Sequence, residues 1–97
     1  MTKKIGGNQR ASRQAKLNMM VGDTVLVNFL FQDEKEVDLR GKIERREGGY
    51  FLGGYDVQIP IKDVKFNGYE RVLLVTVPKG SYIEQQLKQL KEAGVVR

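Results

Sequence analysis

The sequence predicts a mostly β domain, a small barrel of five strands with one C-terminal helix packed on it. Apolar residues recur at every second position through much of residues 24–77, which is the period of a strand with one buried face. Glycine pairs and turn residues divide this region into short, closely connected segments. Beyond residue 80 the apolar spacing changes to that of a helix.

The centre of this prediction is residues 39–64, LRGKIERREGGYFLGGYDVQIPIKDV. Leu39 and Ile43 belong to one apolar row of its first part, with Gly41 between them, and residues 55–61 alternate in the same way. The two runs are separated by GGYFLGG, whose glycine pairs supply the positive φ angles that tight hairpin turns need. We therefore expect a meander of a long strand, a short strand and a third strand, followed by a tight or 3₁₀ turn.

Residues 24–31, TVLVNFLF, and 71–77, RVLLVTV, predict two further strands. Both are apolar on both faces; in the first, Leu26 and Leu30 lie opposite the row that begins at Val25. A strand that is apolar on both sides must be covered on both sides. We therefore expect another element of the chain to pack over Leu26 and Leu30.

Residues 81–94 predict an amphipathic helix of the same domain. Ser81 is a suitable N-cap, Glu84 completes a capping box three residues later, and Gly94 is a suitable C-terminal stop. The apolar face consists of Ile83, Leu87 and Leu90. We expect Leu87 and Leu90 to be buried over the two-faced strands. The alternative is that this face docks on another protein, as a helix in a groove.

The net charge of +5 is confined to the N-terminal segment. Residues 1–20 contain five basic residues and no acid, whereas residues 21–97 contain twelve of each. The segment has almost no apolar content before Leu17, so alone it cannot offset the entropy lost on ordering. The sequence thus predicts a disordered, flexible basic arm over 1–20, attached to the barrel at 21–80. Such an arm either binds phosphate or serves only as a solubilising tail.

Several classes of function are disfavoured by composition. The chain has no histidine and no cysteine, which removes the usual general base and the thiolate metal ligands. It contains no P-loop, GxGxxG or GxSxG motif. We therefore expect a protein that is not an enzyme, with no catalytic residue and no cofactor.

The spacing of the acidic residues disfavours a metal site, and the lack of a long apolar run disfavours a membrane span. Four carboxylates fall within residues 33–38, but their spacing matches no calcium loop, so we expect a solvated hairpin loop and no metal site. No run approaches eighteen apolar residues, and no apolar stretch follows the N-terminal lysines. We expect a cytoplasmic protein without a membrane partner.

Nucleic-acid binding is indicated by basic residues beside aromatic ones. Arginines and lysines share the solvent-exposed face of the strand at 39–46. Tyr50 and Phe51 follow in the adjacent hairpin, and because side chains alternate along a strand, one of the two must point outward. Cations for phosphate and a ring for base stacking are what a single-strand platform needs. The alternative is that glutamates 44 and 47 pair with these arginines and that Tyr50 is ordinary hairpin packing. The candidate residues are Lys3, Lys4, Arg10, Arg13, Lys16, Arg40, Lys42, Arg45, Arg46, Tyr50 and Phe51.

The segments GDTVLVNF, RGKIERR and DVQIPIKDVKF, with the hairpin between the last two, carry a family resemblance. Over about residues 22–66 the chain resembles the SH3-like and Sm-like small β-barrels, in particular the C-terminal barrel of bacterial ribosome-maturation factors. The resemblance implies an SH3-like barrel and suggests RNA as a ligand. The basic arm and the C-terminal helix lie outside it.

A protein partner is the other hypothesis. SH3-like barrels often bind peptides or proteins, and small ones with basic tails occur in phage and mobile-element proteins that bind host machinery. Tyr50, Phe51, Tyr55 and Tyr69 are candidates to line such a surface. We therefore expect a nucleic-acid-binding module, with RNA or single strands favoured, and keep a protein–protein interaction module as the alternative. The sequence does not indicate an oligomeric state.

Overall fold

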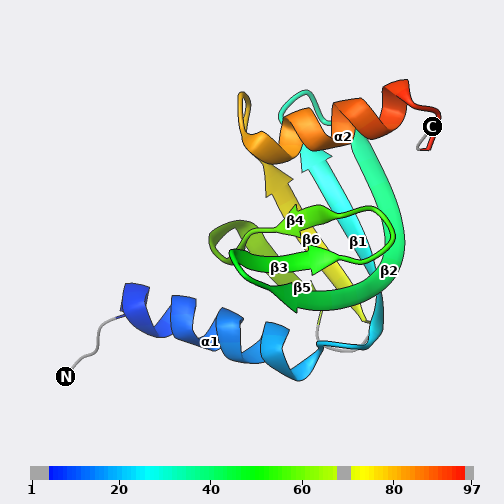
Figure 1. Ribbon diagram of the computed structural model, residues 1–97. Coiled ribbons are helices and arrows are strands. Elements are labelled where there is room, and N and C mark those ends of the chain that lie inside the picture. The colour runs from blue at the N-terminus through cyan, green and yellow to red at the C-terminus, as the bar shows by residue number, and fades with distance from the viewer. Residues whose placement is uncertain (1–4, 68–70, 96–97) are drawn as a thin grey trace.

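The computed structural model describes residues 5–67 and 71–95, and the side chains from residue 12 onward within these ranges. A curled six-stranded sheet forms a half-barrel with one helix at each end (Figure 1). In chain order the elements are α1 (Ile5–Met19), β1 (Thr24–Phe31), β2 (Glu36–Arg46), β3 (Gly49–Leu52), β4 (Val57–Ile59), the 3₁₀ turn η1 (Ile61–Asp63), β5 (Val64–Asn67), β6 (Val72–Val77) and α2 (Tyr82–Glu92). The mostly β class and the C-terminal helix are confirmed.

The strand order of the sheet is β4-β3-β2-β1-β6-β5. β1 and β6 run parallel, and the other neighbouring strands are antiparallel. The predicted meander over 39–64 and the 3₁₀ turn are confirmed, but the expected number of five strands is wrong. The additional strand is β5, which pairs with β6 from Val64↔Val75 to Asn67↔Val72. β5 directly follows the 3₁₀ turn and its ladder partner β6 is distant in the chain, so the sequence indicated only a turn here.

β2 belongs to both halves of the half-barrel. Its first part pairs with β1 from Glu36 to Lys42, and its last part pairs with β3 from Ile43 to Arg46. At the transition the backbone of Gly41 lies so close to β3 that an added Cβ would be 2.7 Å from the Gly53 carbonyl oxygen. The Gly53 N–H donates to the Lys42 carbonyl across the same junction, at 2.7 Å. Only glycine permits this approach.

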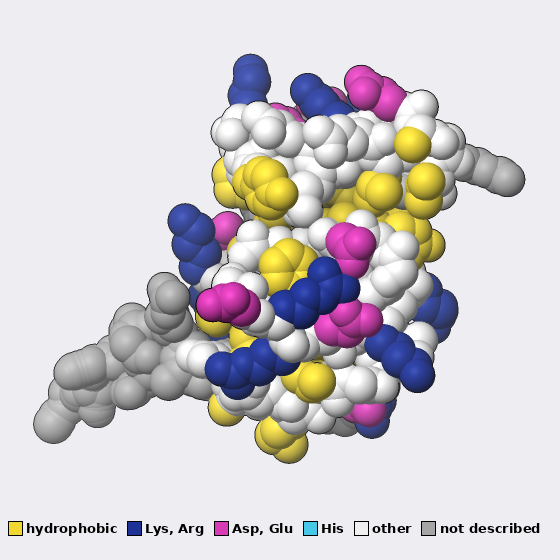
Figure 2. Space-filling model, viewed as in Figure 1, with side chains coloured by type: hydrophobic (Ala, Val, Ile, Leu, Met, Phe, Trp, Pro, Cys, Tyr) yellow, Lys and Arg dark blue, Asp and Glu magenta, His cyan; other side chains and the backbone are white. Residues whose placement is uncertain are grey.

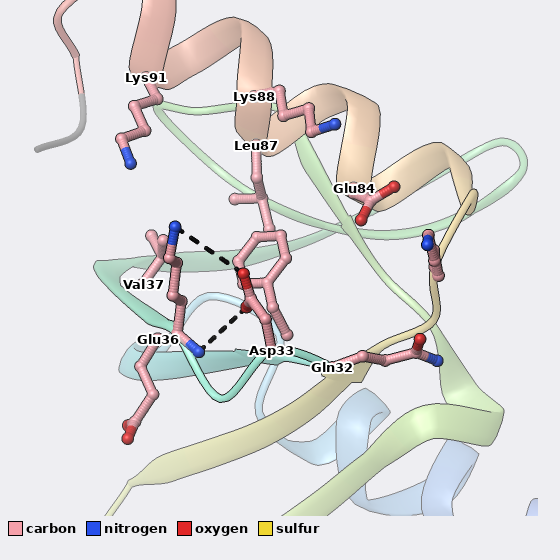
Figure 3. Close-up of a pocket in the computed structure, with 11 residues that line it drawn as sticks. Gln32, Asp33, Glu36, Val37, Glu84, Leu87, Lys88 and Lys91 are labelled. Carbon is pink, nitrogen blue, oxygen red and sulfur yellow. Dashed lines mark hydrogen bonds and ion pairs between the residues drawn. The ribbon is translucent and has the colours of Figure 1, made fainter.

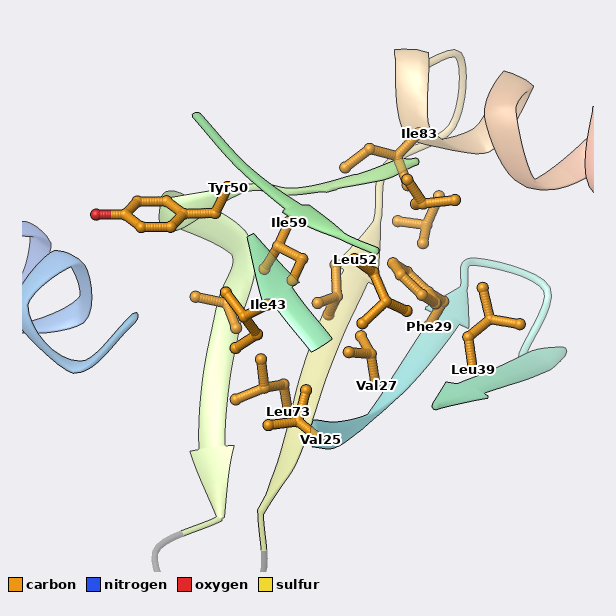
Figure 4. Packing of buried hydrophobic residues seen from close by; sticks show 14 of the residues in the cluster. Val25, Val27, Phe29, Leu39, Ile43, Tyr50, Leu52, Ile59, Leu73 and Ile83 are labelled. Carbon is orange, nitrogen blue, oxygen red and sulfur yellow. The ribbon is translucent and has the colours of Figure 1, made fainter. Parts of the chain in front are cut away.

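The core is formed by the inward-facing side chains of the sheet and by one face of each helix (Figure 4). Val25, Val27 and Phe29 of β1 are fully buried, as the alternation predicts. Leu17 enters the same core from α1, and Leu87 enters it from α2. The two helices therefore close the two ends of the half-barrel (Figure 1).

α2 begins and ends as the sequence predicts. The Ser81 Oγ accepts a hydrogen bond from the Glu84 N–H at 3.2 Å. The Glu84 carboxylate accepts from the Gly80 N–H at 2.9 Å, one residue before the position that a capping box predicts. Gly94 has a φ of 78° and follows the last turn.

The expected cover over Leu26 and Leu30 is wrong. The burial of Leu87 is confirmed and Leu90 is half-buried, but α2 packs into the mouth of the half-barrel, among inward-facing residues. Leu30 stays 42% exposed and Leu74, on the neighbouring strand, 43% exposed. Leu26 lies between Arg40 and Val72 in the sheet, and neighbouring side chains rather than a helix half-bury it.

The expectation of a disordered arm is wrong over Ile5–Met19, which forms α1. Composition alone disfavours order here, but Leu17 is fully buried in the core. A helix that is marginal in isolation is stabilised when tertiary packing buries one of its residues. Lys3 and Lys4 of the predicted arm lie outside the described residues.

We expect Gly41→Ala to lower the free energy of unfolding by about 1–3 kcal/mol, because the new Cβ meets backbone rather than a flexible side chain. Urea denaturation measures the change. The control is Gly48→Ala, where an added Cβ meets nothing within 4 Å and the substitution acts through a positive φ of 96°. A cost at position 41 below that at position 48 would contradict the close approach.

We expect Leu87→Ala to destabilise the fold by about 2–4 kcal/mol, since it leaves a cavity between α2 and the core. Gln89→Ala, at an exposed position of the same helix, is expected to change stability by less than about 0.5 kcal/mol. The same denaturation experiment compares the two variants. Equal effects would mean that α2 does not close the half-barrel.

Candidate nucleic-acid interface

α1 is held on the end of the half-barrel by polar contacts around one buried leucine. Beside Leu17, the Asn18 Oδ1 accepts hydrogen bonds from the Tyr50 hydroxyl and from Arg45 Nη1, the latter at 2.9 Å. Arg13 Nη1 donates to the Lys62 carbonyl at 2.9 Å. α1 therefore lies against η1 and the β2–β3 hairpin in one defined orientation.

The junction between α1 and β1 is tied to β2 by backbone hydrogen bonds. The Gly22 N–H donates to the Ile43 carbonyl at 2.8 Å, and the Ile43 N–H donates to the Asp23 carbonyl at 3.1 Å. Val21 forms an isolated parallel bridge with Ile43. These contacts fix the point at which the chain leaves the helix, so the basic residues of α1 keep a constant relation to the sheet.

Four cations gather at this end of the molecule, and we call them the α1-end basic surface: Arg13, Lys16, Arg45 and Lys62. Lys16 Nζ lies 5.3 Å from the centre of the Phe66 ring, and the Arg45 guanidinium lies 5.6 Å from that of Tyr50. Within the described part of the chain, none of the four has a carboxylate oxygen within 4.0 Å. Their charge is therefore not neutralised by ion pairs there.

The outer face of the β2–β3 hairpin is different, because Arg46 is neutralised. Its guanidinium forms ion pairs with Glu44 and with Asp56, the second at 2.7 Å. The hydrogen bond that Arg46 donates to Asp56, followed by the one that it donates to Glu44, raises the pKa of Arg46 above its usual value. Arg46 also lies 5.0 Å from the centre of the Phe51 ring. The alternative in which a glutamate pairs with an arginine of this strand is therefore correct for Glu44 and Arg46.

The two candidate aromatic residues alternate as the strand period requires. Tyr50 points inward and is 2% exposed, whereas Phe51 points outward and is half-buried beside Arg46. A ring that is freely exposed next to unpaired cations is not formed at this hairpin. Tyr50 is correspondingly unavailable to line a surface for a protein partner, and Tyr55 packs against the core. Tyr69 lies outside the described residues.

Arg40 and Lys42 are exposed on the part of β2 that pairs with β1, opposite Leu26 and Thr24. The structure therefore separates the candidate residues into three places: the α1 end, the Arg46–Phe51 pair, and the outer face of β2. Arg10 belongs to α1, and its side chain is not described. Figure 2 shows basic and acidic side chains interspersed over one face of the molecule, in keeping with a neutral body.

Asn18 and Lys62 belong to this end of the molecule although no sequence pattern indicated them. Asn18 connects α1 to Tyr50 across 32 residues of chain, and Lys62 meets Arg13 across 49 residues. No local pattern reports contacts of this separation. The signal that was available is the position of Asn18 directly after Leu17, the only large apolar residue between Ile5 and Met19.

Comparison with known proteins finds no matching family model, and no curated protein or solved structure with significant similarity to this chain. No helix in residues 5–67 and 71–95 is long and apolar enough to cross a membrane. Functional inference for this protein therefore depends on the chemistry of its surfaces.

We expect Leu17→Ala to release α1 from the half-barrel, because Leu17 is the buried anchor of the helix. A loss of about 2 kcal/mol corresponds to amide exchange in α1 that is about 30-fold faster. Hydrogen exchange followed residue by residue measures this, with the exposed Ser12→Ala as the control. Unchanged protection in Leu17→Ala would show that α1 is held by other contacts.

Proposed function

We propose that this protein is a non-catalytic nucleic-acid-binding module that contacts phosphates through the α1-end basic surface. The observation that carries the proposal is the concentration of charge. The whole net charge of +5 belongs to residues 1–20, and α1 of that segment packs beside Arg45 and Lys62, which also have no carboxylate partner within the described residues. Unpaired cations in a cluster attract a polyanion and release its counterions.

A helix that is already ordered is a better phosphate ligand than a flexible arm. Arg10, Arg13 and Lys16 recur at every third position of α1, which are neighbouring positions on a helix surface. Their backbone entropy is lost on folding and not on binding. Arginine also offers a planar fork that matches two phosphate oxygens. Side chains of this kind contact phosphates rather than base edges, so we expect little dependence on sequence.

The preference for RNA or single strands is part of the proposal. It is supported by the resemblance of residues 22–66 to SH3-like and Sm-like barrels, and by the outward-facing, half-buried Phe51 beside Arg46, since base stacking requires a ring that faces outward. The SH3-like character of the sheet and a cytoplasmic location are likewise inferred from the sequence. The absence of histidine and cysteine from the chain supports a role in binding rather than catalysis.

The alternative function is a protein–protein interaction module. The observation that favours it is the outer face of β1 and β6, where Leu30 and Leu74 remain largely exposed on adjacent strands. Apolar side chains that share an exposed face mark many protein contact surfaces. This alternative predicts no binding of nucleic acid even at low salt.

We expect the full chain to bind single-stranded RNA with an affinity that falls steeply as salt rises. The double variant Arg13→Gln/Lys16→Gln should reduce the slope of log K against log salt by about 1.4 for single strands and by about 1.8 for a duplex. Fluorescence anisotropy with single-stranded RNA, duplex RNA and duplex DNA measures the slopes and the preference among the three.

The matched control is Arg40→Gln/Lys42→Gln, which removes the same charge from the outer face of β2. It should leave the slope nearly unchanged if binding occurs at the α1 end. Equal slopes in the two variants would assign binding to net charge alone. No binding of any nucleic acid at low salt would contradict the proposed function and favour a protein partner.

A further inference from the structure

α2 lies at the end of the molecule opposite α1 (Figure 1). Between α2 and the loop that joins β1 to β2 lies a groove (Figure 3). Its volume is about 680 Å³, within the range typical of ligand sites. Phe31, Val37 and Leu87 form an apolar floor, and charged side chains surround it. Leu87 points into the groove from α2, and Val37 faces it from the β2 side (Figure 3).

The acidic side chains of the rim are already engaged within the protein. Asp33 accepts a hydrogen bond from the Lys35 backbone N–H at 3.2 Å and pairs with its ammonium at 3.8 Å. Glu36 accepts from Asn28 Nδ2 at 2.8 Å. The Glu84 carboxylate accepts from the Gly80 N–H at the start of α2. Each carboxylate of the groove therefore has an internal donor.

Three of the four lysines that line the groove are not paired with a carboxylate of the described residues. Lys79, Lys88 and Lys91 are exposed, and over residues 12–67 and 71–95 none has a carboxylate oxygen within 4.0 Å. Lys88 and Lys91 project from the α2 wall of the groove (Figure 3). Four lysines and three carboxylates line the groove, so its rim carries a net charge of +1 around an apolar floor.

We propose that this groove binds an acidic peptide segment that carries one large apolar side chain. The apolar side chain contacts the half-buried Phe31 and Val37 beside the buried Leu87, and the flanking carboxylates meet the ammonium groups of the rim. α2 lines the groove from Glu84 to Lys91, a length of about 10 Å at the helical rise. That length fits about three residues of extended chain.

A peptide fits this groove better than a nucleic acid. The apolar floor offers little to a phosphate backbone, which carries a charge at every nucleotide and would pass the carboxylates of Asp33, Glu36 and Glu84. Carboxylates on a peptide are separated by neutral positions, so they can meet the lysines and avoid the acids. An apolar side chain inserted between charged rims is also the usual anatomy of a protein interface.

This inference does not rest on the proposed binding of nucleic acid. The groove and the α1-end basic surface lie at opposite ends of the half-barrel and share no residue (Figure 1). The double variant Arg13→Gln/Lys16→Gln should therefore bind the acidic peptide as the unaltered chain does. If one of the two sites does not bind its ligand in solution, the binding result for the other site can still be interpreted.

The test is a titration of the isotope-labelled full chain, followed through its backbone amide NMR signals, with a short peptide that has a central phenylalanine between glutamates. We expect saturable shifts confined to residues 31–37 and 79–91, with a Kd of about 1 mM or lower. A peptide with serine in place of the phenylalanine should bind at least about tenfold more weakly.

Charge reversal tests the rim. Lys88→Glu/Lys91→Glu should weaken peptide binding by about tenfold, whereas Lys42→Glu/Lys65→Glu, which changes net charge equally at exposed positions away from the groove, should leave Kd within about twofold. Lys79→Glu repeats the test in the loop before α2, where it leaves the helix sequence intact. The amide spectrum of each variant reports whether it folds.

Three results would overturn the proposal. The first is the absence of shifts in the groove at about 1 mM peptide, and the second is equal weakening by the two double variants. The third is that single-stranded RNA shifts the groove amides while the acidic peptide shifts only those near α1. The proposal is upheld if groove shifts depend on both the phenylalanine and the lysines of the rim.

Discussion

The close contact between Gly41 and the Gly53 carbonyl is the constraint on which the architecture depends. It lets β2 leave β1 and continue along β3 without interrupting its backbone hydrogen bonds. A side chain at position 41 would separate the two strands at this point. Because one strand serves both halves, the sheet curls into a half-barrel with an apolar interior and two open ends. α1 and α2 cover the apolar interior at these two ends.

α2 covers its end in two ways. Ile83 and Leu87 bury apolar surface, and the side-chain amide of Gln86 forms hydrogen bonds with backbone groups along the edge of β4. Its Oε1 accepts from the Gln58 N–H at 3.2 Å, and its Nε2 donates to the Asp56 carbonyl at 3.1 Å, as a neighbouring strand would. This protects an edge strand from pairing with another chain. It also fixes α2 relative to the sheet, so the groove beside Leu87 is preformed and a ligand does not have to order it.

The two ends of the half-barrel differ in their free charge. At the α1 end, Arg13, Lys16 and Arg45 contact carbonyls, amides and rings rather than carboxylates. At the α2 end, acids and lysines share the rim, and the acids are bonded internally. A cluster of cations without carboxylate partners suits a polyanion, and a mixed rim around an apolar floor suits a peptide. If both proposals hold, the protein is a small adaptor with one site for phosphates and one for an acidic peptide.

Local signals in the sequence determined the meander, the 3₁₀ turn, the limits of α2 and the confinement of net charge to residues 1–20. Each depends on side-chain period, capping or composition within a few residues, so one short window contains all the relevant information. The sequence did not determine which of Tyr50 and Phe51 points inward, because alternation requires only that the two side chains lie on opposite faces of the strand.

Tertiary structure alone decided the order of α1, the existence of β5, the exposure of Leu30 and Leu74, and the ion pair of Arg46 with Asp56. The physical reason is that each depends on partners distant in the chain. Leu17 finds its burial site only in an assembled half-barrel, and Asn18 meets Tyr50 across 32 residues. β5 is a strand only because β6 offers it a ladder, and Arg46 meets Asp56 only after the β3–β4 turn has formed. Composition reports the cost of ordering α1 but not the buried contact that offsets it.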